Sequence, residues 1–113
     1  MDSVAVSPRV FVLQDDGTKN LVPAMQFGSL EIMLSGRIST YATAPIIDAI
    51  KRALKTFTPH DYLLLIGDPL AIGAATAYAS YKNGGIVKVL KWDRQERTYY
   101  ALTMDLGLMK DAS

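Results

Sequence analysis

Residues 61–93, DYLLLIGDPLAIGAATAYASYKNGGIVKVLKWD, decide the fold class of this chain. An apolar run ends at a Gly-Asp-Pro break, an alanine-rich segment follows, and a Gly-Gly pair precedes a second apolar run. Asp68 is a favoured helix N-cap, and Pro69 is favoured at the first helical position. The order is typical of a parallel strand–helix–strand unit joined by a right-handed crossover, over residues 61–67, 69–83 and 86–92.

Upstream of this unit, an Asp-Gly pair separates two short apolar runs, residues 9–14 and 21–22. Glycine supplies the positive φ that a tight turn needs, so the pair predicts a β-hairpin. Pro23 has no N–H to donate to a ladder, which places this hairpin at a sheet edge.

Two longer periodic segments come next in the chain. Residues 26–34 alternate and predict a strand, whose buried face carries Leu30, Ile32 and Leu34. Residues 45–57 repeat apolar side chains at helical spacing and predict an amphipathic helix, with Thr43 or Ala44 as its cap. A polar turn and a last alternating strand over 97–106 complete the chain.

These elements predict a single α/β domain over residues 1–113, with a small mixed sheet of five to six strands, two helices and a central βαβ unit. The ends, 1–8 and 108–113, are expected to be flexible. Because the strand over 61–67 carries an apolar run without alternation, residues 62–66, we expect helices on both of its faces. The strand order should then reverse there, which would make this strand a topological switch point.

Composition excludes several classes of site. The chain has 113 residues, half of them apolar, a formal net charge of +1 and no cysteine, which excludes disulfides and thiolate chemistry. His60 is the single histidine, so a multi-histidine metal site is excluded within one chain, although carboxylate-bound Mg²⁺ is not. The first ten residues do not resemble a signal peptide and no apolar run could span a bilayer, so we expect a cytoplasmic protein without a membrane partner.

In open α/β sheets, ligands bind outside the carboxyl ends of strands at a switch point. The expected binding residues are therefore those that follow the predicted strands: Arg37, Gly67, Asp68, Trp92, Asp93 and Arg94. Asp68 as a helix cap would compete with a phosphate for the same amides, and GDPLAIG lacks the spacing of a phosphate loop. We expect no catalytic constellation, resident metal or cofactor. A nucleotide- and Mg²⁺-dependent enzyme using Asp68 and Asp93 remains an alternative.

A second alternative is binding of single-stranded nucleic acid by the hairpin over residues 82–100. Basic side chains interleaved with aromatic ones are typical of such surfaces. The residues concerned are Lys82, Lys88, Lys91, Arg94, Arg97 and Tyr99. The near-neutral net charge disfavours this alternative.

The segments FGSLEIML, DYLLLIGDPLAIG and GGIVKVLKWDRQERTYYAL, within residues 24–104, resemble small proteins encoded by tailed bacteriophages. The resemblance implies a phage origin and expression in a bacterial host cytoplasm, and it brings no catalytic residues. Strands rich in Tyr, Met and Trp are typical of interfaces. The leading hypothesis is a non-enzymatic accessory protein that binds itself, a host protein or another phage protein.

Overall fold

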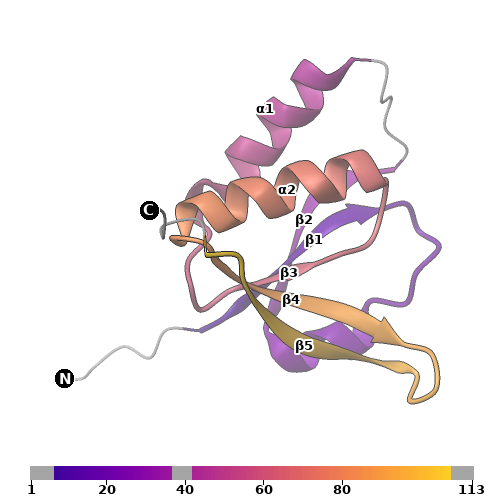
Figure 1. Ribbon diagram of the computed structural model, residues 1–113. Coiled ribbons are helices and arrows are strands. Elements are labelled where there is room, and N and C mark those ends of the chain that lie inside the picture. Colours follow the sequence, from indigo (N-terminus) through magenta and orange to yellow (C-terminus); the bar gives the residue numbers. More distant parts are fainter. Residues whose placement is uncertain (1–6, 37–41, 108–113) are drawn as a thin grey trace.

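The computed structural model describes residues 7–36 and 42–107, which form one five-stranded sheet in the order β2-β1-β3-β4-β5 (Figure 1). The strands are β1 (Arg9–Asp15), β2 (Ser29–Ser35), β3 (Tyr62–Leu64), β4 (Ile86–Asp93) and β5 (Thr98–Asp105). The helices are η1 (Val22–Phe27), α1 (Thr43–Ala53), η2 (Leu54–Thr56) and α2 (Pro69–Lys82). Neighbouring strands are parallel except for β5, which is antiparallel to β4.

The predicted α/β class and the central βαβ unit are confirmed. β3 lies in the middle of the strand order, pairs in parallel with β4, and is connected to it by α2. Only three residues of the apolar run have strand geometry, and two of them, Leu63 and Leu64, are fully buried on opposite faces. The expected flexible ends fall largely outside the described residues.

The predicted N-terminal hairpin is wrong. Residues 9–14 belong to β1, which pairs in parallel with both β2 and β3, while Val22 and Pro23 begin the 3-10 helix η1. The Asp-Gly pair does form a local turn, since the Asp15 carboxylate accepts the Gly17 N–H at 3.0 Å. Side chains from Val10 to Leu13 are at most 2% exposed, and such a run needs strands on both sides and cover on both faces.

β2 is an edge strand, which explains why its predicted burial pattern holds only in part. Leu34 is buried and Leu30 is partly buried, but Ile32 is 42% exposed. α1 is amphipathic as expected, although Ala42 rather than Thr43 or Ala44 occupies its N-cap and forms no side-chain capping bond.

Both long helices cover the same face of the sheet, which corrects the expectation of helices on opposite faces (Figure 1). The chain moves in one direction across the sheet from β2 to β3 and from β3 to β4, so right-handed crossovers put α1 and α2 on one side. The step from β1 to β2 runs the other way, and η1 therefore lies on the opposite face. There it packs with Val12, Leu64 and Tyr99.

This connectivity places the switch point between β1 and β3. The connection that leaves β1 leads to β2 on one side of this pair, and the connection that leaves β3 leads to β4 on the other side. Within the described part of the chain, no helix combines the length and apolarity needed to cross a membrane.

Candidate functional site

A polar cavity of about 480 Å³ lies at the switch point, between the carboxyl ends of β1 and β3. It lies where the topology of an open parallel sheet leaves a crevice. Its lining comes from the end of β1, the loop after it, the loop after β3 and the first turn of α2: Gln14, Asp16, Lys19, Leu65, Ile66, Gly67, Asp68 and Ile72.

Gln14 holds this end of the sheet together. Its side-chain Nε2 donates to the Gly36 carbonyl at 2.9 Å, and its Oε1 accepts the Asp68 N–H at 2.8 Å. The side chain is 9% exposed, so both bonds form in a largely dry environment, where an unpaired amide would be costly. One amide therefore joins β1 to the loops that follow β2 and β3.

Gly67 is required by this arrangement. Its φ is +126°, and a Cβ built there would lie 2.6 Å from both Cβ and Oε1 of Gln14. The next residue, Asp68, caps α2, with its Oδ1 accepting the Leu70 N–H at 2.9 Å. Because the cap already uses an amide of the helix N-terminus, the cavity is poorly suited to cradle a phosphate.

The structure brings together only some of the expected binding residues. Gly67 and Asp68 line the switch-point cavity, whereas Trp92 lines a neighbouring cavity of about 280 Å³ with Lys19 and Ile66. Asp93 closes the β4–β5 turn by accepting the N–H groups of residues 95 and 96, and Arg94 is exposed in that turn. Arg37 lies outside the described residues.

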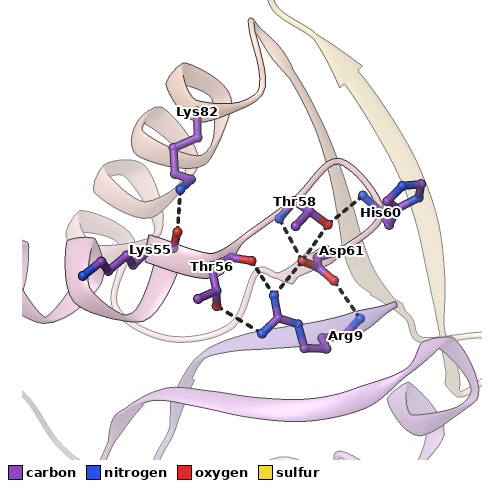
Figure 2. Close-up of polar contacts among 7 residues, drawn as sticks. All are labelled: Arg9, Lys55, Thr56, Thr58, His60, Asp61 and Lys82. Carbon is purple, nitrogen blue, oxygen red and sulfur yellow. Dashed lines mark hydrogen bonds and ion pairs between the residues drawn. The ribbon is translucent and has the colours of Figure 1, made fainter. Parts of the chain in front are cut away.

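The enzyme alternative would use the carboxylates of Asp68 and Asp93 together. Asp68 lines the switch-point cavity, but Asp93 lines neither of these two cavities. Among residues 7–36 and 42–107, no three acidic or histidine side chains form a group able to hold a metal ion. His60 is exposed in the turn before β3, where its N–H donates to the Thr58 hydroxyl, as expected of a turn residue (Figure 2).

Sequence reasoning missed Gln14, Asp16 and Lys19, because the hairpin interpretation placed them at a sheet edge. The available signal was the position of Gln14, which directly follows the apolar run of residues 10–13 and precedes two aspartates. Polar residues directly after a buried parallel strand lie at the carboxyl edge of the sheet.

The residues of the nucleic-acid alternative do not form one surface. Tyr99 is 4% exposed, donates its hydroxyl to the Asn20 carbonyl at 2.8 Å, and has its pKa raised by burial. Lys88 Nζ lies 4.4 Å from the centroid of the Tyr62 ring, on the η1 side of the sheet. Lys82 reaches the Lys55 carbonyl at the end of the helix layer (Figure 2). Three basic residues of the nucleic-acid alternative are exposed on β4 and the turn after it: Lys91, Arg94 and Arg97.

A polar network at the opposite, amino edge of the sheet is structural (Figure 2). The Asp61 carboxylate is 2% exposed and accepts both the N–H and the hydroxyl of Thr58, together with the N–H and the guanidinium of Arg9. Burial alone would raise the pKa of Asp61, but these hydrogen bonds outweigh it and lower that pKa below its ordinary value. Arg9 also donates to Thr56, so the network ties the end of η2 to β1.

An uncovered apolar surface lies on α2. Leu70, Gly73, Ala77 and Tyr81, hereafter the outer face of α2, are all exposed, with Leu70 at 45% and Tyr81 at 76%. Their spacing of three or four residues puts them on one side of the helix. Beside them, an open apolar groove of about 470 Å³ runs between α1 and α2, lined by Ile47, Ile50, Lys51, Ala74, Ala77, Tyr78 and Tyr81.

Comparison with known proteins gives a family match. A family model described as "Phage Pam3 gp32-like protein" covers residues 8–106. The chain belongs to this phage family. No curated protein and no solved structure matches it. Membership supports the phage origin that the sequence resemblance implied, and it attaches no activity to the surfaces described above.

Proposed function

We propose that this phage-family protein is a non-enzymatic accessory protein that binds another protein through the outer face of α2. The observation that carries the proposal is the composition of α2, which is apolar on every side. A helix of this kind is normally buried all round, whereas one side of α2 is exposed.

The two sides of α2 have different neighbours. Ala71, Ala75 and Ala79 are fully buried against the sheet, and their small side chains allow the helix backbone to approach it closely. The outer face repeats the same small-residue pattern at Gly73 and Ala77, yet a Cβ built on Gly73 would meet nothing within 4 Å. Residues 69–81 contain no charged side chain, so no charge on the exposed side of α2 is stabilised by remaining in water.

The shape of this surface indicates the chemistry of its partner. Gly73 and Ala77 are small and lie along the helix between the bulkier Leu70 and Tyr81, and Lys51 is the one charged residue that lines the adjoining apolar groove. An amphipathic helix would fit here, with its apolar side against Gly73 and Ala77 and an acidic residue near Lys51. Helix-in-groove recognition of this kind gains affinity from a few buried apolar anchors.

The test begins with proteins recovered from phage-infected bacteria on immobilised native chain, followed by binding measurements with each purified candidate. Ala77→Glu would place a carboxylate on the outer face of α2, beside the groove, and should weaken the interaction by at least about tenfold, which corresponds to about 1.4 kcal/mol. Arg52→Glu is the matched control, since it introduces the same residue on the exposed, charged side of α1. A partner that binds native and Ala77→Glu proteins equally well would refute the proposal.

A further inference from the structure

We infer that β5 pairs with β5 of a second copy of this chain, so that two five-stranded sheets join into one of ten strands. This inference uses a surface separate from the outer face of α2 and does not depend on it. In Figure 1, β5 forms the margin of the sheet and its turn projects away from the helix layer.

β5 lacks the protection that exposed sheet edges usually carry. It is eight residues long, is last in the strand order and pairs with β4 on one side within the described chain. Natural edge strands are commonly short or interrupted by lysine, proline or a bulge. The sequence of β5, TYYALTMD, contains no lysine, arginine or proline, and its only charged residue is the terminal Asp105. At the other margin, β2 carries Glu31 in its middle.

The register with β4 shows which backbone groups of β5 face the open side. Leu106 N–H donates to the Gly85 carbonyl at 2.7 Å, one step beyond the Ile86–Asp105 pair. In an antiparallel ladder, hydrogen-bonded residues alternate with residues that point the other way. The N–H and C=O groups of Tyr99, Ala101 and Thr103 therefore point away from β4, toward any added strand.

Apolar side chains accompany these outward-pointing backbone groups. Tyr100 and Leu102 are 38% and 43% exposed, although Leu102 lies opposite Val89, whose side chain packs under the helix layer. The helices thus stop short of β5 and leave both side chains uncovered. Pairing with another strand would cover them, and aromatic–aliphatic pairs across strands are stabilising.

The charges at the two ends of β5 favour a second copy as the added strand. Arg97 precedes the strand and Asp105 ends it, so antiparallel self-pairing brings the basic end of one copy to the acidic end of the other. With Ala101 opposite Ala101 of the second copy, the outward backbone groups match. Tyr100 then faces Leu102, and Arg97 faces Asp105. Centring the pair on Leu102 would instead place Tyr99 opposite Asp105.

Because the chain contains no cysteine, single cysteines can test this register. Hydrogen-bonded antiparallel partners have Cα atoms about 5.5 Å apart, within the range that a disulfide can bridge. Ala101→Cys should therefore form a covalent dimer upon mild oxidation. Thr103→Cys is the matched control on the same edge: the two Thr103 positions would be offset by four residues, roughly 14 Å. It should stay monomeric on a denaturing gel.

Sedimentation of the native chain should show a reversible dimer. Ala101→Lys should shift the equilibrium to monomer, because two like charges would meet at the two-fold axis of the dimer, while the monomer keeps cooperative thermal unfolding. A native chain that stays monomeric at sub-millimolar concentration would overturn the inference, as would equal cross-linking of the two cysteine variants. Ala77→Glu separates this interface from the proposed α2 surface: dimerisation should persist in that variant, and its loss would assign self-association to α2 instead.

Discussion

α1 and α2 lie side by side on one face of the same sheet, but different kinds of residue occupy their outer sides. α1 buries Ile46 and Ile50 inward and presents charged residues outward. α2 buries its alanines inward and presents apolar or small residues outward. Because both helices do the same work for the core, their inner sides are explained by folding alone. Of the two helices, α2 is the one whose outer side is an apolar surface that a contact outside this chain would cover.

The ends of the two helices are also held by different chemistry. The C-terminal end of the α1–η2 segment is tied to β1 through the part-exposed Arg9 guanidinium, which donates to Thr56. The same guanidinium pairs with the buried Asp61 carboxylate, with Arg9 Nη2 at 3.1 Å from Asp61 Oδ2. The start of α2 is tied to β1 by the neutral amide of Gln14. Acid should therefore loosen the first attachment and leave the second unchanged.

The largest effect is expected from a charge placed under α2. Ala75→Glu puts a carboxylate between the helix and the sheet at a fully buried position without a partner. We expect a loss of more than about 4 kcal/mol in the free energy of unfolding, enough to unfold much of the protein. Chemical denaturation followed by circular dichroism measures it. A loss below about 1 kcal/mol would mean that α2 sits less tightly on the sheet than its buried alanines indicate.

A smaller loss is expected when the attachment of α1 is weakened. Asp61→Asn keeps the shape of the side chain but directs an amide at some of the four donors that surround it, and should cost about 2–3 kcal/mol. The lowered pKa of Asp61 adds a signature in pH. A group whose folded pKa lies below its unfolded value stabilises the fold above the unfolded pKa, and this contribution is lost as pH falls through the folded pKa.

Denaturation curves measured from neutral pH down to strongly acidic pH resolve this signature. The native chain should lose stability as pH falls below the ordinary aspartate range, about 3.9, and the loss should be smaller in Asp61→Asn. If both proteins show the same pH dependence, other carboxylates govern the acid transition.

The neutral attachment of α2 should contribute less. Gln14→Ala removes the bonds to Gly36 and Asp68, and the expected cost is about 1–2 kcal/mol with no change in the acid profile. Gly67→Ala tests the same contact from the other side, because its methyl group would displace the Gln14 side chain. The double variant should lose less unfolding free energy than the sum of the two single-variant losses, since both substitutions act on one contact. Full additivity would contradict this.

The sequence predicted the helices and the βαβ unit well because their signals are local. Asp68 and Pro69 start α2, and apolar spacing defines α1. The N-terminal error arose where a local signal met a tertiary constraint: an Asp-Gly turn indicated a hairpin, but the all-apolar β1 needed a strand on each side. Local turn chemistry specifies how the chain bends, not which strand it next pairs with.

The candidate site was predictable at the residues that follow β3 and not at those at the end of β1 and after it. Gly67 and Asp68 come directly after a recognisable strand, whereas Gln14 matters because β1 lies beside β3, a fact about strand order. The sequence of α2 contains two repeats of small residues, Ala71-Ala75-Ala79 and Gly73-Ala77, but only the structure shows that the sheet covers the first and leaves the second open.

The smallest effect on stability should come from the substitution that matters most for binding. Ala77→Glu introduces the same residue as Ala75→Glu two positions further along α2, but onto its exposed side. Glutamate is a good helix former, so the free energy of unfolding should change by no more than about 0.5 kcal/mol. A thermal melt of the two variants beside the native chain measures the contrast directly. If Ala77→Glu destabilised the isolated protein as strongly as Ala75→Glu, the outer face would belong to the core, and its apolar character would no longer point to a partner.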